Sequence, residues 1–282
     1  MYVFQTQKEL QIELNKTENL SKKIGFVPTM GALHQGHLSL LEQSLVENDI
    51  TVLSIFVNPT QFNNAEDLKK YPRTLEKDVE LVEKLNKNIL VFAPSVSEIY
   101  EGNTISTSFE YDGLENQMEG KHRPGHFDGV GTIVKKLFEI IKPTNSYFGE
   151  KDFQQLQIVK KLVEKYHIPV NIIGCEIFRE TTGLAMSSRN ERLTESARKE
   201  AKLIYQLLLQ AKNKFGTKSA NEVEKFIENE IKKNKNFTLE YFEIAAEDTL
   251  LACQRKVKNK KYRAFIAVFI ENIRLIDNIS LK

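Results

Sequence analysis

The sequence has few cysteines, and it has no hydrophobic segment long enough to cross a membrane. Only two of its 282 residues are cysteines, Cys175 and Cys253, and they lie outside any CxxC motif. This argues against a disulfide framework and a cysteine-based zinc site, and it favours a reducing compartment. The longest apolar run, AFIAVFI at 264–270, is far shorter than the roughly 20 residues of a membrane-spanning helix. The N-terminal segment MYVFQTQKELQIELNK lacks the apolar core of a signal peptide, so we expect a cytoplasmic protein without membrane attachment.

An excess of charge of one sign is also lacking, since 40 Lys and Arg residues are balanced by 38 Asp and Glu residues. A protein that binds nucleic acid usually carries a clear basic excess, so we expect no nucleic-acid partner. The balance still permits a local basic pocket for one phosphorylated small molecule. The remaining composition, 41% hydrophobic and 28% charged, is typical of a globular protein, and the length fits two compact domains.

Short apolar segments alternate with longer amphipathic segments through the first two-thirds of the chain. The predicted strands are residues 23–28, 50–59, 88–94, 145–149 and 170–178, and the predicted helices are the segment after Gly36, 75–86, 130–141 and 152–166. Unbroken apolar strands that alternate with helices are typical of a doubly wound parallel sheet, an α/β fold. Such a sheet binds ligands at the carboxyl ends of its strands. Pro28, Asn58 and Gly149 all lie at these ends.

The pattern changes after about residue 178. The predicted elements there are two helices, 194–215 with Thr194 as its cap and 219–234, and two segments that alternate as antiparallel strands do, 238–246 and 262–277. We therefore expect two domains, a doubly wound domain at 1–178 and a smaller α+β domain at 179–282.

Two histidines stand where the first predicted strand gives way to a helix. In PTMGALHQGHLSLL, residues 28–41, His34 and His37 enclose Gly36. A metal site would need a third ligand, which is not evident nearby, and a buried core pair would not need glycines here. A helix N-terminus attracts anions through its unpaired N–H groups and its dipole, and Gly31 and Gly36 let the backbone approach a phosphate. We interpret the pair as a phosphate-facing helix start.

Two further polar segments suit the binding of phosphates. FGEKDFQQLQ, residues 148–157, places Lys151 and Asp152 at a helix start. TTGLAMSSRNERL, residues 181–193, combines hydroxyl side chains with Arg189, whose guanidinium is a fixed fork of donors. Each segment alone is also compatible with an ordinary helix start or surface loop. Their joint placement with the histidines favours a binding site.

Neutral amides and a basic loop complete the set of candidates. FVNPTQF, residues 56–62, offers Asn58 and Gln61 to a polar substrate without phosphate. YPRTLEKD, residues 71–78, supplies Arg73 for charge neutralisation and Asp78 for a metal. The remaining segment, EGKHRPGHFDGVGT at 119–132, is too basic and too rich in turns to be core; it carries Lys121, His122, Arg123 and His126.

Taken in order, PTMGALHQGH, FVNPTQF, YPRTLEKD, HRPGHFDGV, FGEKDFQQL and GLAMSSRN resemble the pantoate–β-alanine ligase family of the HxGH nucleotidylyltransferase superfamily. The resemblance covers essentially the whole chain. HxGH alone indicates only the superfamily, whereas GEKDFQQL and MSSRN together narrow it to this family. One departure is Thr60, where the family commonly has methionine (NPMQF), and it bears on the shape of the pocket.

The resemblance implies the ATP-dependent ligation of (R)-pantoate and β-alanine to pantothenate, a coenzyme A precursor. The pantoate carboxylate attacks the α-phosphorus of ATP, giving pantoyl adenylate and pyrophosphate, and the amine of β-alanine then displaces AMP. A carboxylate is already ionised near neutral pH, so the first step needs alignment and charge neutralisation rather than a strong base. The resemblance also implies Mg²⁺, a homodimer, a Rossmann-like domain at 1–178 that binds nucleotide and pantoate, and a domain at 179–282 that closes over the active site.

Residue by residue, the resemblance assigns four sets of roles. Catalysis falls to His37, the proton donor, with His34, Lys151, Ser187 and Arg189. ATP binding falls to Met30, Gly31, Ala32, Leu33, His34, Gln35, Gly36, His37, Gly149, Glu150, Lys151, Asp152, Phe178, Met186, Ser187, Ser188 and Arg189. Pantoate or β-alanine binding falls to Gln61, Gln155, Asn58, Arg123 and His126, with Tyr71 beside them, and Mg²⁺ binding to Asp78 and Asp152.

Two other functions are compatible with parts of the pattern. A related HxGH nucleotidylyltransferase would transfer a nucleotide to a phosphorylated acceptor, for which more Lys and Arg are expected than the amides of Gln61 and Gln155. A non-catalytic nucleotide- or RNA-binding protein would show no turnover, and its RNA binding would weaken steeply with salt.

Overall fold

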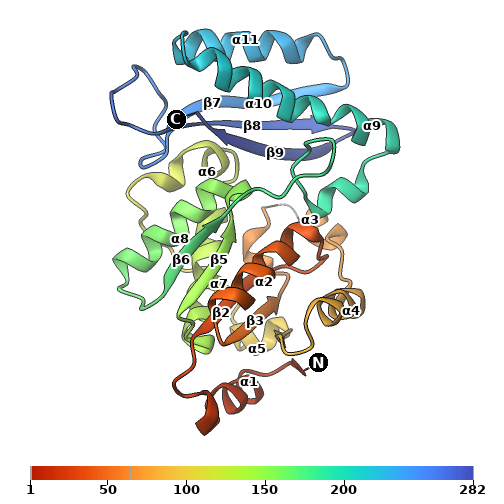
Figure 1. Cartoon of the computed structure of the whole chain (residues 1–282), viewed down its shortest axis with the longest axis vertical. Coiled ribbons are helices and arrows are strands. Elements are labelled where there is room, and N and C mark those ends of the chain that lie inside the picture. Colours follow the sequence, from red (N-terminus) through yellow and green to blue (C-terminus); the bar gives the residue numbers. More distant parts are fainter. Residues whose placement is uncertain (1, 64, 282) are drawn as a thin grey trace. The chain divides into compact units, whose positions relative to one another are not determined.

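The computed structural model describes residues 2–63 and 65–281, which fall into two compact units (Figure 1). The larger unit comprises the described residues up to Glu115, together with Glu119–Glu150 and Gln155–Glu176. The smaller unit comprises Asn116–Met118, Lys151–Gln154 and the chain from Ile177 onward. Among the described residues, none of the helices combines the length and the apolar character that a membrane span requires.

A parallel sheet of six strands, in the order β1-β4-β3-β2-β5-β6, forms the centre of the larger unit. Its strands are β1 Tyr2–Phe4, β2 Ile24–Thr29, β3 Ile50–Ile55, β4 Leu90–Phe92, β5 Asn145–Gly149 and β6 Asn171–Cys175. The predicted Rossmann-like α/β fold is thus confirmed. The edge strand β1 was not predicted, because three residues are too few to show a strand pattern and Tyr2 is 63% exposed.

The strand order reverses beside β2. The chain proceeds from β2 to β3 and β4 on one side, and it then crosses to β5 and β6 on the other. In open parallel sheets, ligands bind at the carboxyl ends of the strands at such a reversal. The loop after Thr29 of β2 and the segment after Gly149 of β5 both start at the carboxyl ends of strands at this reversal.

Helices connect these strands and bury apolar side chains against them. They are α1 Gln7–Leu14, α2 Gln35–Glu47, α3 Ala65–Lys70, α4 Leu75–Leu85, α5 Val96–Tyr100, α6 Met118–His122, α7 His126–Ile141 and α8 Phe153–Lys165, with short 3₁₀ turns at Thr17–Asn19, Pro59–Gln61, Leu114–Asn116 and Glu150–Asp152. One core cluster joins Val27, Leu53 and Val91 of the strands to Leu41 of α2 and Val82 of α4. The helices predicted for this unit all form.

The smaller unit consists of an antiparallel sheet with helices packed on one face. Its elements are a 3₁₀ turn Ser188–Arg192, α9 Glu195–Glu200, α10 Lys202–Phe215, α11 Ala220–Lys232, β7 Phe237–Ala246, β8 Tyr262–Ile270 and β9 Ile273–Ser280. The sheet order is β7-β8-β9, and α10 and α11 lie along it in Figure 1. Ile204 and Leu208 of α10 and Ile227 of α11 share a buried cluster with Ile266 and Val268 of β8.

Two predictions for the smaller unit need correction. The single helix expected at 194–215 is two, because a 3₁₀-type bond from Ile204 N–H to the Ala201 carbonyl interrupts the α-helical pattern. The predicted cap is confirmed, since Thr194 Oγ1 accepts from Ala197 N–H at 3.2 Å. The single strand expected within 262–277 is β8 and β9, joined by a tight turn in which Glu271 and Asn272 adopt φ of 50° and 65°.

Candidate active site

The loop between β2 and α2 has an unusual backbone. Gly31 and Ala32 adopt positive φ angles of 80° and 51°, a conformation that is uncommon for alanine. Thr29 Oγ1 supports the turn by accepting from Gly31 N–H at 3.2 Å and donating to the Ser54 carbonyl at 2.7 Å. The loop ends at His34, the N-cap of α2, so His34 and His37 lie on the first turn of a helix as predicted.

The two histidine rings are stacked, with centroids 4.0 Å apart and planes inclined by 29°. His37 Nδ1 accepts the backbone N–H of His34 at 3.2 Å. A neutral imidazole that accepts at Nδ1 carries its proton on Nε2. The backbone therefore selects the tautomer in which Nε2 of His37 donates.

Asp78, which was predicted to bind Mg²⁺, has a different role in the structure. The carboxylate is 3% exposed, and its two oxygens accept from the backbone N–H groups of Leu33 at 2.8 Å and Ala32 at 3.0 Å. Thr74 Oγ1 lies 3.3 Å from both oxygens. The buried carboxylate thus supports the histidine loop from α4, and both of its oxygens are taken by protein donors rather than directed at a metal ion.

Asp78→Asn is expected to lower the free energy of unfolding by about 2–3 kcal/mol, because an amide offers one acceptor and turns an N–H toward a backbone donor. Urea denaturation measures the change. Glu76→Gln is the matched control, since it neutralises an exposed carboxylate in the same first turn of α4. We expect the control to stay within about 0.5 kcal/mol of the parent. An equally small effect of Asp78→Asn would contradict the supporting role.

Asn58 supports the turn that carries Gln61. Its side chain is fully buried, Oδ1 accepts from the Tyr100 hydroxyl at 2.6 Å, and Nδ2 donates to the Gly129 carbonyl at 3.1 Å. Burial raises the pKa of Tyr100, so its hydroxyl stays protonated and donates. Thr60, the departure from the family pattern, joins the network by donating to Asn58 Oδ1 at 3.2 Å. Asn58 thus exposes no side-chain atom to a substrate, contrary to its predicted role.

Side chains of α7 and of the residues before it contact the backbone carbonyl of Gln61. His126 Nδ1 lies 2.9 Å from this oxygen, and Arg123 Nη2 donates to it at 3.3 Å. Since a carbonyl only accepts, His126 must be protonated at Nδ1. Tyr71 packs edge-to-face against Phe62, the next residue, at 5.6 Å. The half-buried side chain of Gln61 therefore extends from a fixed backbone.

Lys151 follows β5 in a 3₁₀ turn, Glu150–Asp152, that leads into α8. Its ammonium lies 3.5 Å from Asp152 Oδ2, and the two side chains are 17% and 49% exposed. No neighbouring atom within the described chain requires a glycine at position 149, because a Cβ there would meet nothing within 4 Å. Gln155, in the first turn of α8, is half-buried.

The MSSRN segment follows a short hairpin in the smaller unit. Met186 N–H donates to the carbonyl of Phe178, whose side chain is 39% exposed. Ser187 Oγ then accepts from Arg189 N–H at 3.3 Å and caps the turn Ser188–Arg192. Ser187, Ser188 and Arg189 are therefore presented at the start of a short helical turn.

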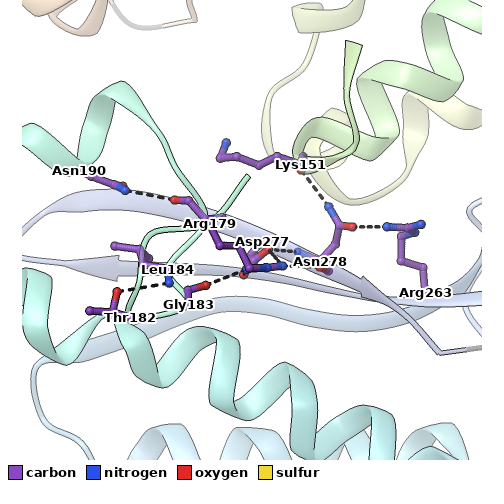
Figure 2. Close-up of polar contacts among 10 residues, drawn as sticks. Lys151, Arg179, Thr182, Gly183, Leu184, Asn190, Arg263, Asp277 and Asn278 are labelled. Carbon is purple, nitrogen blue, oxygen red and sulfur yellow. Dashed lines mark hydrogen bonds and ion pairs between the residues drawn. The ribbon is translucent and has the colours of Figure 1, made fainter. Parts of the chain in front are cut away.

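Sequence reasoning missed an ion pair that anchors this hairpin. Arg179 donates to both oxygens of Asp277, at 2.6 and 3.0 Å, and to the Gly183 carbonyl at 3.0 Å (Figure 2). Burial raises the pKa of the Asp277 carboxyl, and the Arg179 guanidinium opposes that rise. No local motif marks this pair, because the two residues are 98 positions apart.

The structure divides the predicted site residues between the two units. The larger unit carries Met30, Gly31, Ala32, Leu33, His34, Gln35, Gly36, His37, Asn58, Gln61, Asp78, Arg123, His126, Gly149, Glu150 and Gln155. The smaller unit carries Lys151, Asp152, Phe178, Met186, Ser187, Ser188 and Arg189. Within the larger unit, hydrogen bonds link Asp78 to the histidine loop and link Arg123 and His126 to Gln61.

A cysteine nucleophile does not fit this arrangement. Cys175 ends β6 and is 6% exposed. Burial raises the pKa of its thiol to about 12, so the thiol is protonated at neutral pH and is a poor nucleophile. The arrangement instead supplies cations, amides and backbone donors, which suit the binding of phosphates and of polar oxygens.

Known proteins resemble the chain over its full length. A family model described as pantoate-beta-alanine ligase matches residues 2–280. A pantothenate synthetase of Flavobacterium psychrophilum is 66% identical over 282 residues, and one of Christiangramia forsetii is 54% identical over 282 residues. Both alignments cover 100% of this chain and 100% of the relative.

Solved structures are similar as well. The crystal structure of pantothenate synthetase from Thermus thermophilus aligns with a TM-score of 0.91 at 39% identity, covering 100% of this chain and 99% of that one. The pantoate-beta-alanine ligase of Francisella tularensis, solved in complex with beta-gamma ATP and beta-alanine, aligns with a TM-score of 0.82 at 38% identity. That alignment covers 100% of this chain and 98% of the other.

Proposed function

The chain belongs to the pantoate–β-alanine ligase family, and on this basis we propose how its residues carry out the ATP-dependent ligation of pantoate and β-alanine. The enzyme activates the carboxylate of pantoate as pantoyl adenylate, and the amine of β-alanine then displaces AMP. The observation that carries the proposal is the helix start at His34 and His37. It lies where the strand order reverses, and its loop and tautomer are fixed by hydrogen bonds.

The first step is promoted by donors that neutralise the charge on the phosphates of ATP. In the larger unit these are the Nε2–H of His37, His34 and the backbone of the loop at Met30–Leu33. In the smaller unit they are Lys151, Ser187, Ser188 and Arg189. Donors that are held in place before the reaction stabilise developing charge without a cost of reorganisation. We assign His37 mainly to this stabilisation, because a ring whose Nδ1 accepts a backbone N–H is neutral and holds its Nε2 proton tightly.

Pantoate offers both hydroxyls and a carboxylate, and amides match this mixture because each supplies a donor and an acceptor. We assign Gln61 and Gln155 to direct contact with pantoate. Arg123 and His126 act on the same site through the carbonyl of Gln61. An acceptor that carried a phosphate would call for cations in place of these amides, so the related nucleotidylyltransferase reaction is not favoured.

The carboxylate of Asp152 and the phosphates of ATP together offer oxygen ligands that suit Mg²⁺. Among residues 2–63 and 65–281, no cluster of three or more His, Cys, Asp or Glu side chains forms a metal site by itself. Mg²⁺ commonly takes one or two carboxylates, substrate phosphates and water, and the half-exposed Asp152 can supply the carboxylate. When bound, the ion would neutralise phosphate charge.

Three further expectations from the sequence are part of the proposal. A homodimer is tested by light scattering coupled to size exclusion, and a cytoplasmic location by cell fractionation. Closure of the domain at 179–282 over the active site is tested by small-angle scattering with and without ATP and pantoate. A radius of gyration that does not change on binding would contradict closure.

Oxygen-18 in the carboxylate of pantoate tests the adenylate directly. The labelled oxygen forms a bond to the α-phosphorus while the bond to pyrophosphate breaks. The amine of β-alanine then attacks the acyl carbon and the carbon–oxygen bond breaks, so the label leaves with AMP. We expect one labelled oxygen per AMP by mass spectrometry. Unlabelled AMP, or AMP retained on a product, would contradict the assigned reaction.

Gly129→Ala is expected to raise the KM for pantoate by roughly 10-fold or more, because misplacing a binding group by about 1 Å is costly. A Cβ at 129 would lie 2.3 Å from the Thr60 carbonyl oxygen and 2.9 Å from Gln61 N. The backbone that carries Gln61 must therefore move. Steady-state kinetics measure the KM, and Gly216→Ala, whose Cβ finds its nearest neighbour at 3.6 Å, is the control. Equal KM values for the two variants would contradict the role of Gln61.

A further inference from the structure

Asn278 lies on β9 at the centre of the network in Figure 2, and it is 1% exposed. Its side-chain amide joins two parts of the smaller unit. Arg263 Nη1 donates to Asn278 Oδ1 at 2.6 Å, and Asn278 Nδ2 donates to the backbone carbonyl of Lys151 at 2.9 Å. Asn278 thus holds the backbone of the residue whose ammonium is assigned to the phosphates.

The main chain of Asn278 is fixed on both sides. Its N–H donates to Asp277 Oδ1 at 2.8 Å, and its carbonyl accepts from Arg179 Nη2 at 3.3 Å. Arg179 is itself held by the paired bonds to Asp277 and by the Tyr205 ring, 3.8 Å from the guanidinium carbon. A side chain on so constrained a backbone can act as a rigid support.

Arg263 determines which way the amide of Asn278 points. A guanidinium only donates, so Oδ1 must face Arg263 and Nδ2 must face Lys151. Arg263 is fixed in turn by Glu247, at 3.0 Å from its Nε, and by the Phe153 ring, 3.9 Å from its guanidinium carbon. Phe153 follows Lys151 by two positions, so the same short segment is held at two points.

We propose that Asn278 is a positioning residue for adenylate formation. It places the backbone of Lys151 so that the Lys151 ammonium meets the phosphates of ATP. The proposal rests on the proposed function, because it takes Lys151 as a phosphate ligand. The bond is made to the backbone carbonyl, and the ammonium therefore remains available for the substrate. Displacing a catalytic group by about 1 Å can cost on the order of 100-fold in rate.

Asn278→Asp separates positioning from general support. Aspartate keeps the acceptor that faces Arg263, but it places an oxygen instead of an N–H against the carbonyl of Lys151. We expect the kcat of pantoate-dependent ATP–pyrophosphate exchange to fall by roughly 10- to 100-fold. The KM for pantoate should change by less than about threefold, because the lost bond is to Lys151 and not to Gln61 or Gln155, which are assigned to pantoate. Asn259→Asp, the same change in an exposed turn, should match the parent.

A double-mutant cycle with Lys151→Ala completes the test. Lys151→Ala removes the ammonium but keeps the backbone carbonyl that accepts from Asn278 Nδ2. If Asn278 acts through the ammonium, Asn278→Asp should lower kcat by no more than about twofold further in the Lys151→Ala background. Additive losses, or parent-like kcat in Asn278→Asp alone, would overturn the positioning role while leaving the proposed function intact. Parent-like exchange in Lys151→Ala would overturn the positioning role together with the assignment of Lys151 to the phosphates, and the ligation itself would stand. If circular dichroism shows that Asn278→Asp is unfolded, Asn278→Ala enters the same cycle with the same criteria.

Discussion

His37→Ala should reduce pantoate-dependent ATP–pyrophosphate exchange by about 100-fold or more, the effect of removing a preorganised donor from a developing charge. Nδ1 of His37 accepts a backbone N–H, so Nε2 is the atom that donates to the phosphates. Alanine removes that donor and also one bond that orders the helix start. Exchange of labelled pyrophosphate into ATP, at saturating ATP and pantoate, measures the loss.

Two variants sharpen the interpretation of this result. His37→Gln returns an N–H donor near the position of Nε2 but cannot transfer a proton at neutral pH. Recovery of at least about 10-fold over His37→Ala would favour phosphate stabilisation over proton donation. His167→Asn is the control, because His167 is exposed and its positive φ suits asparagine. Parent-like exchange in His37→Ala would contradict the assignment of the helix start.

Lys151→Ala is the second variant from which a loss of about 100-fold or more in exchange is expected. Lys151 is 17% exposed, and its neighbour Asp152 is the proposed Mg²⁺ ligand. Loss of the ammonium removes a positive charge that neutralises the phosphates in the transition state, so kcat should fall more than the KM for pantoate rises.

The matched control is Lys160→Ala, an exposed lysine on α8, the helix that follows Lys151. It removes the same charge from the same part of the chain and should leave exchange within about twofold of the parent. Exchange in Lys151→Ala that falls no further than in Lys160→Ala would show that the ammonium has no role in adenylation.

Much of the fold could be predicted because the signals are local. Strands such as β3 are short segments rich in β-branched and apolar residues, and α4 has an apolar stripe, so a short window of sequence contains what determines them. The break at Ala201 had no such signal, since neither glycine nor proline marks it. The turn at Glu271 and Asn272 was missed for a similar reason, because these residues lie within one alternating segment.

The site could be predicted only where its residues form motifs. The histidines, Lys151 and the MSSRN segment are local patterns, and the family resemblance made them specific. The supporting residues act across long separations, as in the bond between Ala32 and Asp78, which are 46 positions apart. Asn58 was mistaken for a substrate ligand because Tyr100 and Gly129, which occupy its amide, are remote in sequence. Polar residues whose partners are distant cannot be distinguished by sequence from those that face a ligand.

ATP–pyrophosphate exchange measured without β-alanine tests the central claim most directly. The account predicts exchange only when pantoate is present, because pantoyl adenylate must form and return to ATP. Addition of β-alanine should then convert the bound adenylate to pantothenate with one AMP released per product. Exchange that proceeds without pantoate, or that begins only when β-alanine is added, would contradict the two-step ligation.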